Sequence, residues 1–255
     1  MANVAWCITG GGANLRASVK VMERVKEVYK TNITLFLTRW GFEVARIFGV
    51  LSTLRGIAPG GYYQEFLVGD EGMYYIGRIN LGRYRIVVIA PATANTVAKM
   101  VLGIADNIAS TLYSQALKSR IPVVVLPTDM PSSDGYIESE TPCYVDKNLC
   151  NYTTCGECAS SKVCPVNAIV TIGQFMRIDL SKCIGCERCV YTCPTGAIKC
   201  WEKIRLMPRE IDVENIDTLK RQPYTYVIKD AYELEKMLVN TSRAYRLPSS
   251  QSLGL

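Results

Sequence analysis

The sequence of 255 residues contains no histidine. This absence excludes Ser-His-Asp and Cys-His catalysis, and it excludes every metal site built on imidazole ligands. Proton transfer must therefore use Asp, Glu, Tyr, Lys or Cys side chains, or solvent. The sequence alone assigns no catalytic residue.

Long apolar runs are also missing. No run approaches the roughly 18 residues that span a bilayer, and no secretory signal pattern precedes the first apolar run, Val4–Ile8. We therefore expect a cytoplasmic protein with no membrane partner. The net charge of +6 is mild, and Lys and Arg are scattered along the chain. Nucleic acid is not an expected partner, because its binders usually gather basic residues in stripes or patches.

Short apolar strands alternate with helical patterns over residues 1 to about 130. Strands are expected at Val4–Thr9, Ile33–Thr38, Arg85–Ala90 and Pro122–Leu126. Helices are expected at Leu15–Tyr29, through Val44–Phe48, from near Asn95, and at about Asn107–Lys118. Strands that are apolar on both faces and separated by helices predict a parallel sheet covered on both sides. The fold class is α/β, a doubly wound, flavodoxin- or Rossmann-like parallel sheet.

Changes in composition divide the chain. Residues 1–140 form the α/β domain and end in a polar linker, Pro131–Glu140; residues 141–205 form a cysteine-rich module. Residues 206–245 hold a strand candidate, Tyr224–Ile228, and an amphipathic helix, Asp230–Leu238. Because this segment has too little apolar surface to fold alone, we expect it to return to the first domain, which makes the module an insertion. Residues 246–255 are expected to be a disordered tail.

Eight of the eleven cysteines lie between positions 150 and 193. The run Cys183-x2-Cys186-x2-Cys189-x3-Cys193-Pro194 has the spacing of a bacterial ferredoxin, in which three thiolates wrap one cubane and the fourth ligates the other cluster. The first half is less regular, Cys150-x4-Cys155-x2-Cys158-x5-Cys164-Pro165. However, the hexapeptides that begin at Cys164 and Cys193 are similar (CPVNAI and CPTGAI), which indicates an internal repeat. The module is therefore predicted to be of the bacterial 2[4Fe–4S] ferredoxin type.

Cross-ligation between the two halves assigns the ligands. Cluster 1 is predicted to be held by Cys150, Cys155, Cys158 and Cys193, and cluster 2 by Cys183, Cys186, Cys189 and Cys164. Zinc is the alternative, but zinc usually takes paired ligands separated by a longer loop. Three cysteines are left over, and we expect buried structural roles for Cys7, Cys143 and Cys200. Cys143 is an alternative to Cys150 as a ligand.

A glycine turn follows the first strand. Gly10, Gly11 and Gly12, with Asn14 before the helix, would let backbone amides approach a phosphate. The dinucleotide fingerprint is not met, because its third glycine is replaced by Leu15. The second strand ends in Thr38-Arg39 rather than in an acidic residue. A mononucleotide phosphate held by the turn and by Thr38 or Arg39 is favoured over NAD. NADP remains an alternative, with Arg39 on its 2′-phosphate.

A second candidate segment follows the buried strand IVVIA. It runs Pro91-Ala92-Thr93-Ala94-Asn95-Thr96, and its small residues would let a flat ring lie against the backbone. The alternative interpretation is a simple helix N-cap made by Asn95 or Thr96. The segments Ala105-Asp106-Asn107 and Pro127-Thr128-Asp129 come later in the chain, the second directly after the last strand of this domain.

The motifs PATANT, GIADN and Pro127-Thr128-Asp129 resemble the flavoprotein superfamily of the homo-oligomeric flavin-containing cysteine decarboxylases and the flavin prenyltransferases. Followed by a two-cluster module, they are similar to the archaeoflavoproteins and the archaeal dihydromethanopterin reductases. The resemblance implies FMN, a homo-oligomer built from trimers with FMN near a subunit interface, and a ferredoxin-type electron donor. It implies that Gly10–Gly12 and Thr38 hold the phosphate. It also implies that Thr93–Thr96 and Ala105–Asn107 surround the rest of FMN.

The same resemblance implies an activity. Electrons from the clusters would reach FMN, and a hydride would pass to a ring C=N bond of a pterin, dihydromethanopterin. Candidate proton donors are solvent, Tyr62, Tyr63 and Asp129. The alternatives are an electron carrier between ferredoxin and a partner protein, and an NADP-dependent flavin reductase. Decarboxylation is not expected, since the active-site histidine and the PxMNxxMW stretch of the decarboxylases are absent.

Overall fold

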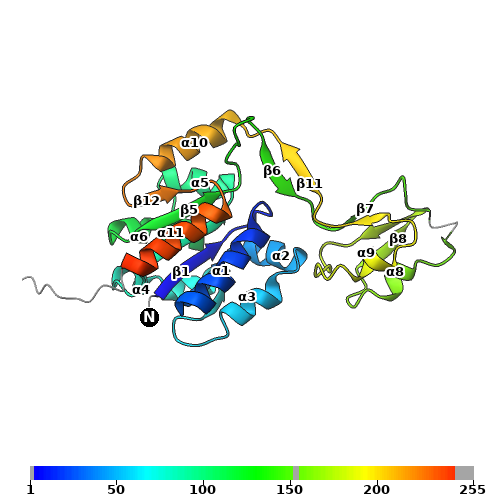
Figure 1. The fold of residues 1–255 in the computed structure, drawn as a ribbon, viewed down its shortest axis with the longest axis horizontal. Helices are drawn as coiled ribbons and strands as arrows, with labels where there is room; N and C mark the ends of the chain where they lie inside the picture. The colour runs from blue at the N-terminus through cyan, green and yellow to red at the C-terminus, as the bar shows by residue number, and fades with distance from the viewer. Residues whose placement is uncertain (1–2, 152–154, 245–255) are drawn as a thin grey trace, which may run out of the picture.

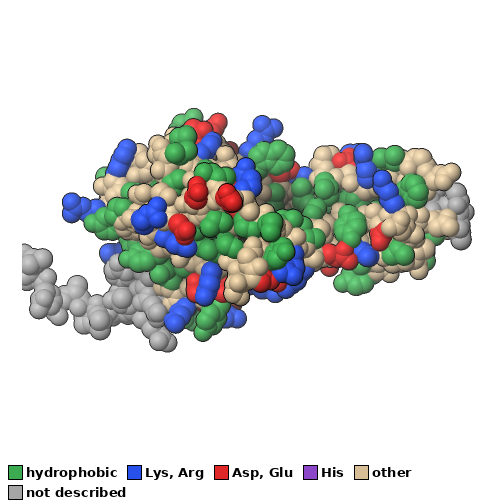
Figure 2. All heavy atoms as spheres, turned by 90° about the horizontal axis from the view of Figure 1, so that it is seen from above, with side chains coloured by type: hydrophobic (Ala, Val, Ile, Leu, Met, Phe, Trp, Pro, Cys, Tyr) green, Lys and Arg blue, Asp and Glu red, His purple; other side chains and the backbone are tan. Residues whose placement is uncertain are grey.

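The structure, a computed structural model, describes residues 3–151 and 155–244. Figure 1 shows an α/β domain and a smaller module that projects from one side of it. Figure 2 shows the module as a separate lobe, and on this face lysine and arginine side chains are scattered over both lobes. The tail expected at residues 246–255 lies outside the described residues.

A six-stranded parallel sheet forms the centre of the larger domain, which confirms the predicted fold class. Its strand order is β12-β5-β4-β1-β2-β3, and every neighbouring pair is parallel. The strands are β1 (Asn3–Ile8), β2 (Asn32–Leu37), β3 (Phe66–Val68), β4 (Ile86–Ala92), β5 (Val123–Pro127) and β12 (Thr225–Val227).

Helices cover both faces of this sheet. One face carries α1 (Leu15–Tyr29), α2 (Arg39–Ile47), α3 (Leu51–Ile57) and α11 (Ala231–Ala244). The other carries the 3₁₀ helix η1 (Gly69–Tyr75), α4 (Gly77–Asn80), α5 (Ala94–Val101), α6 (Ile108–Lys118) and α10 (Glu210–Lys220). On β1, Trp6 and Ile8 face the first layer, and Ala5 and Cys7 face the second. Since both faces are buried, the strands read as continuous apolar runs.

Two helices differ in length from the prediction. A helix is expected through Val44–Phe48, and α2 runs from Arg39 to Ile47, because Thr38 acts as its N-cap. Helix α11 continues to Ala244, beyond the expected end at Leu238. After the module the chain adds β12 to the edge of the sheet beside β5. It then packs α11 on α1, with Arg24 bonded to Glu235 at 2.8 Å.

The chain enters and leaves the module through a two-stranded ribbon. Strand β6 (Ile137–Glu140) pairs antiparallel with β11 (Lys203–Leu206), so part of the expected linker is a strand. Inside the module, β7 (Tyr144–Val145) pairs with β10 (Ile198–Lys199), and β8 (Ile169–Ile172) pairs with β9 (Phe175–Ile178). Two short helices complete it, α8 (Ala159–Lys162) and α9 (Arg188–Thr192).

None of the helices within the described ranges combines the length and the apolar character that a bilayer crossing requires.

Candidate functional site

Three of the predicted segments meet at the carboxyl edge of the sheet. The glycine turn follows β1, Thr93 follows β4 and Thr128 follows β5. The backbone N–H of Thr93 donates to the hydroxyl of Thr9 at 2.9 Å. A Cβ added to Gly11 would lie 2.4 Å from the Thr128 methyl carbon and 3.4 Å from that of Thr93. The structure therefore brings these segments into direct contact at the edge where open α/β sheets bind ligands.

The glycine turn has no room for side chains. A Cβ on Gly10 would lie 2.8 Å from the Cβ of Trp40, and a Cβ on Gly12 would lie 2.5 Å from the ring of Phe48. None of the hydrogen bonds within the described ranges uses the N–H groups of Gly10, Gly11 or Gly12. A phosphate matches this arrangement, since it needs close backbone approach and several N–H donors.

The start of α1 adds to this match. Asn14, its N-cap residue, has φ of +61° and makes no side-chain capping hydrogen bond. The first turn of α1 contains no acidic residue. The positive end of a fifteen-residue helix therefore points toward the glycine turn without a carboxylate of its own to neutralise it.

The residues after β2 have a mixed role. The Thr38 hydroxyl accepts a hydrogen bond from the N–H of Gly41 at 2.9 Å and so caps α2. Arg39 is exposed, and Trp40, which follows it, is 70% exposed while its Cβ lies against Gly10. The Thr38 hydroxyl is thus already engaged in capping α2, whereas Arg39 and Trp40 extend from the same edge into solvent.

The PATANT segment leads into α5, but the N-cap residue of this helix is not one of the two expected. Pro91 and Ala92 are buried, and the N-cap is Thr93, whose hydroxyl accepts from the N–H of Thr96 at 3.4 Å. The alternative prediction of Asn95 or Thr96 as the cap is wrong, because β4 extends to Ala92 and α5 starts at Ala94. Ala94 is half-buried and Asn95 is exposed.

Ala105, Asp106 and Asn107 lie in the loop before α6. Asn107 caps α6 by accepting from the N–H groups of Ala109 and Ser110. The hydrogen bond from Lys99, at 2.6 Å, lowers the pKa of Asp106. No hydrogen bond or ion pair between described residues joins this loop to the glycine turn. Among the described residues the structure therefore shows no polar contact between this predicted segment and the glycine turn, whereas Asp106 is joined to α5 through Lys99.

The four cysteines predicted for cluster 2 lie close to one another. Burial raises the pKa of Cys189 to about 11 and also raises that of Cys183, and the charges of the neighbouring thiolates, Cys164 and Cys186 among them, add to both shifts. The N–H of Ala168 donates to the Cys164 sulfur at 3.2 Å, and that of Gly185 to the Cys183 sulfur at 3.5 Å. Backbone donors to sulfur are typical of iron–sulfur loops.

No three Cys, Asp or Glu side chains within the described ranges converge so as to hold one metal ion. Zinc needs its sulfur ligands about 2.3 Å from one centre. The cysteine spacing of the run from Cys183 to Cys193 is that of a bacterial ferredoxin loop and favours iron–sulfur over zinc.

The cysteines predicted for cluster 1 are Cys150, Cys155, Cys158 and Cys193, all half-buried. Burial acts to raise the pKa of Cys193, but hydrogen bonds from the Thr195 hydroxyl and from nearby backbone N–H groups outweigh it and leave this pKa lowered. A stabilised thiolate is what a metal ligand requires. Residues 152–154 of this loop lie outside the described residues.

The remaining cysteines have two different environments. Cys7 is fully buried in β1, and burial raises its pKa, as expected of a structural thiol. Cys143 and Cys200 form a disulfide, which the sequence did not predict. The reason is the register of β7 and β10: Tyr144 pairs with Lys199, so the next residues outward face each other. This pairing argues against Cys143 as a replacement for Cys150.

Sequence reasoning missed three neighbours of the glycine turn. Trp40 and Phe48 pack on Gly10 and Gly12, and Arg16 is the second residue of α1. No spacing rule signals Phe48, which lies 36 positions after Gly12 in the sequence. Trp40 had a weak signal, since it directly follows the Thr38-Arg39 pair at a strand end.

Comparison with known proteins identifies both parts of the chain. The flavoprotein family model matches residues 1–134, and the 4Fe-4S binding domain model matches residues 176–199. The chain is 37% identical over 235 residues to the dihydromethanopterin reductase (acceptor) of Methanocaldococcus jannaschii, which covers 91% of this chain and 93% of that protein. It is 36% identical over 222 residues to that of Methanosarcina mazei, with 85% and 90% covered.

Two solved structures have a similar fold. Burkholderia xenovorans DmrB in complex with FMN, described as a cubic protein cage for redox transfer, has a TM-score of 0.60 at 24% identity, with 96% of this chain and 98% of that chain covered. HAL3 from Cryptococcus neoformans has a TM-score of 0.50 at 14% identity, with 96% and 98% covered.

Proposed function

Because the chain belongs to the family of the dihydromethanopterin reductases, we propose that it is an FMN-dependent iron–sulfur oxidoreductase that reduces dihydromethanopterin to tetrahydromethanopterin. This proposal rests on sequence identities of 37% and 36% to two such reductases, over almost their whole length. The match extends over both the flavoprotein domain and the cysteine module, so the combination of the two parts is shared and not only one of them.

FMN is proposed to bind at the carboxyl edge of the sheet. Its phosphate would be held by the glycine turn, the start of α1, Thr38 and Arg39, and its ribityl chain and ring would lie along PATANT and the loop before α6. The residues proposed are Gly10, Gly11, Gly12, Asn14, Thr38, Arg39, Pro91, Ala92, Thr93, Ala94, Asn95, Thr96, Ala105, Asp106 and Asn107. The contact of Gly11 with Thr93 and Thr128 supports this placement.

The module is proposed to hold two [4Fe–4S] clusters. Cys150, Cys155, Cys158 and Cys193 would ligate cluster 1, and Cys183, Cys186, Cys189 and Cys164 would ligate cluster 2. The mutual charge interactions of the second set, and the backbone N–H groups that donate to the sulfurs of Cys164 and Cys183, support the assignment. A ferredoxin-type protein, a one-electron carrier, is the proposed electron donor.

The bound cofactors would supply the conversion of two single electrons and one proton from solvent into one hydride, which the pterin C=N bond accepts together with a second proton. The protein must then hold the pterin and provide that proton. Asp129 is connected to the glycine turn through its neighbour, because Thr128 packs on Gly11 and donates to the Asp129 carboxylate at 2.5 Å. Tyr63 instead packs edge-on against Tyr84 beneath Arg78.

We also propose a homo-oligomer built from trimers. Large apolar side chains are exposed on the α/β domain: Trp40 is 70% exposed, Tyr74 89% and Leu102 70%. Exposed apolar side chains in such numbers are typical of a surface that another subunit covers.

The test is anaerobic reduction of the purified protein followed by addition of dihydromethanopterin. Reoxidation of the flavin with formation of a tetrahydropterin supports the reductase. A flavin that stays reduced until a second protein is added would replace this function with electron carriage between proteins, and reduction by NADPH without ferredoxin would favour the NADP-dependent alternative. Material with no flavin absorbance, or with zinc in place of about eight irons per chain, would contradict the proposal altogether.

A further inference from the structure

Glu187 has a backbone conformation that is uncommon for a residue with a side chain. Its φ is +60°, in the left-handed region. In the internal repeat Cys186-Glu187 corresponds to Cys155-Gly156, and Gly156 has φ of +66°. The loop thus requires a left-handed residue at this point, and glycine occupies it in the first half. The second half carries glutamate there, although a residue with a Cβ is disfavoured in this conformation, which points to a role for its side chain.

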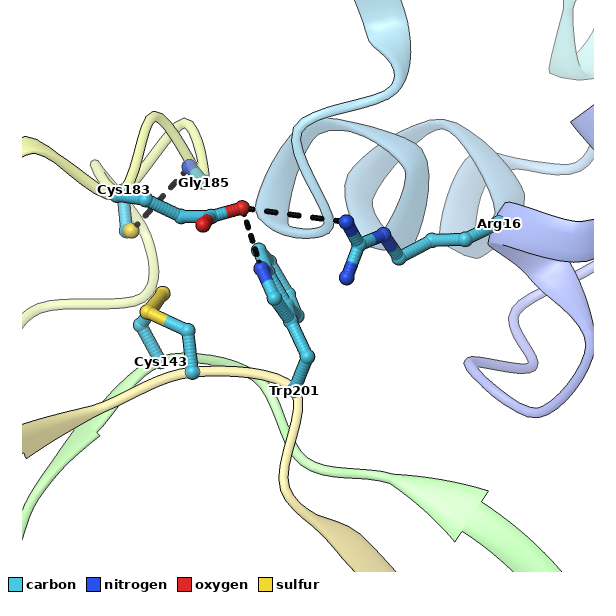
Figure 3. Close-up of a disulfide and its surroundings, with 7 residues drawn as sticks. Arg16, Cys143, Cys183, Gly185 and Trp201 are labelled. Atoms are coloured by element: carbon cyan, nitrogen blue, oxygen red, sulfur yellow. Dashed lines mark hydrogen bonds and ion pairs between the residues drawn. A yellow bond between two sulfur atoms is a disulfide. The ribbon is translucent and has the colours of Figure 1, made fainter.

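That side chain joins the module to the α/β domain. The Glu187 carboxylate accepts a hydrogen bond from the indole N–H of Trp201 at 2.5 Å and lies 4.0 Å from the guanidinium of Arg16. The same guanidinium lies over the Trp201 ring, 4.8 Å from its centroid. Figure 3 shows the Arg16 side chain beside the Trp201 ring. Trp201 also has a left-handed backbone, with φ of +59°, so both members of this hydrogen bond are held in strained conformations.

Trp201 continues the contact to the proposed phosphate site. Its ring packs on Phe48 with centroids 5.1 Å apart. The Phe48 ring in turn fills the space where a Cβ on Gly12 would lie. A continuous line of packed groups therefore runs from the residue after Cys186 to the glycine turn.

The loop of Cys183 and Cys186 makes a second contact of its own. A Cβ on Gly185 would lie 2.4 Å from the carbonyl oxygen of Ile47, and a Cβ on Gly49 would lie 2.5 Å from the carbonyl oxygen of Gly185. Such close backbone approach requires glycine on both sides. Arg46 adds hydrogen bonds to the carbonyls of Cys183 and, at 3.1 Å, Leu180.

The cysteines of the other cluster have no comparable contact. The N–H groups of Cys150 and Cys155 donate to Asp146 and Asn151, and the Cys193 sulfur contacts Thr195. These partners all belong to the module. Within the described ranges, no hydrogen bond, ion pair or ring contact joins these cysteines to residues 3–140. Gly156 has no side chain with which to form a junction like that of Glu187.

We propose that the cluster of Cys183, Cys186, Cys189 and Cys164 is the relay next to the flavin, and that Glu187 is a positioning residue that holds this cluster there through Trp201 and Arg16. The inference rests on the proposed FMN and two-cluster assignment. Each electron leaves a one-electron donor, passes through the cluster of Cys150 and then through the relay cluster, and reaches the flavin. No covalent bond forms or breaks in the electron transfers themselves, and two such electrons, with a proton from solvent that adds to the flavin ring, would reduce one flavin.

The experiment compares anaerobic full-length protein with three variants. Glu187→Gly restores the residue of the other half-repeat and removes the junction, whereas Glu187→Gln keeps an acceptor for the Trp201 N–H. Asn167→Gly is the matched control, because Asn167 also has a left-handed backbone (φ +49°) and corresponds to Gly196 (φ +65°) in the repeat. Iron content and the EPR spectra of the reduced clusters establish that each variant carries both clusters.

The readout is the rate at which clusters reduced by a light flash and a small reductant pass an electron to the flavin. We expect Glu187→Gly to slow this step by on the order of tenfold, because small displacements of reacting groups carry large rate penalties. Glu187→Gln is expected to retain most of the rate, and Asn167→Gly all of it. An unchanged rate in Glu187→Gly, or an equal loss in Asn167→Gly, would overturn the role of Glu187.

Ligand variants test the order of the clusters. Cys155→Ser, which weakens the outer cluster, should leave transfer from the remaining cluster to the flavin intact, whereas Cys186→Ser should abolish it. If instead Cys155→Ser abolished the transfer and Cys186→Ser left it intact, the cluster of Cys150 would be the one next to the flavin. If both behave as expected but dihydromethanopterin is not reduced, the proposed substrate is wrong and the electron path still holds; if the pterin is reduced and the pattern is reversed, only the path is wrong.

Discussion

The α/β domain and the cysteine module are stabilised in different ways. The sheet of the α/β domain is covered on both faces, and each face has an extended apolar core that includes side chains from several helices. The module has one small core, in which Ile169, Met176 and Ile178 pack beside Cys143 and Cys183. A core this small supplies little free energy of folding. The domain can therefore fold from its sequence alone, whereas the module depends on what its cysteines bind.

The largest expected effect is that removal of iron unfolds the module but leaves the α/β domain folded. Chelation of iron is expected to unfold the module, since metal binding provides folding free energy for small metal domains. The α/β domain should keep its own cooperative unfolding transition and its helical signal. Circular dichroism and limited proteolysis before and after chelation measure this difference. A single transition in which both parts unfold together would contradict the comparison.

The next largest effect is expected from a substitution in the proposed FMN site of the α/β domain. Gly11→Ala introduces a Cβ about where the Thr128 methyl lies, at 2.4 Å. Overpacking of this kind costs about 1–3 kcal/mol, so FMN affinity is expected to fall by about ten- to a hundredfold. Quenching of FMN fluorescence by the apo-flavin protein measures it.

Gly56→Ala is the matched control for this variant. No atom lies within 4 Å of a Cβ added to Gly56 in α3. FMN affinity should therefore be unchanged and stability should rise slightly, because alanine favours the helix. Equal losses of affinity in both variants would mean that the glycine turn is not part of the flavin site.

The two parts also differ in how far their sequences predicted them. Continuous apolar strands such as IVVIA can only be buried on both faces, so the parallel sheet could be predicted with its helices. The ferredoxin loop could be predicted because its cysteine spacing follows from the size of the cubane. In both cases the signal is local in sequence.

What could not be predicted depends on contacts between distant residues. Thr93 rather than Asn95 caps α5 because β4 extends two residues further than its apolar run. The Cys143–Cys200 disulfide follows from the register of two strands that are each only two residues long. Glu187 looks like an ordinary polar residue until its backbone angle and its contact with Trp201 are known.

A smaller effect is expected from the charge at the junction. Arg46 places a guanidinium against the carbonyls of Cys183 and Leu180, and no such cation contacts Cys150 or Cys193 in the described part of the chain. Nearby positive charge raises the reduction potential of a cluster. Arg46→Met should therefore lower the potential of the relay cluster and leave the other unchanged, as measured by EPR-monitored titration. Arg55→Met, a change on the neighbouring helix α3 where the guanidinium lies over Phe66 instead, should move neither.

The smallest effect is expected from the disulfide at the base of the module. A cross-link between residues 57 positions apart would by itself add about 2–4 kcal/mol. Cluster ligands already connect the same stretch of chain from Cys150 to Cys193, so the additional stabilisation should be about 2 kcal/mol or less. The double variant Cys143→Ala/Cys200→Ala should lower the unfolding temperature of the module slightly in oxidised protein. The same shift should follow when the wild-type protein is treated with a thiol reductant. Iron content distinguishes a disulfide-bonded Cys143 from a Cys143 that ligates a cluster. If the Cys143→Ala change alone removed iron, Cys143 would be a cluster ligand, and the protein with its clusters bound would not contain the disulfide.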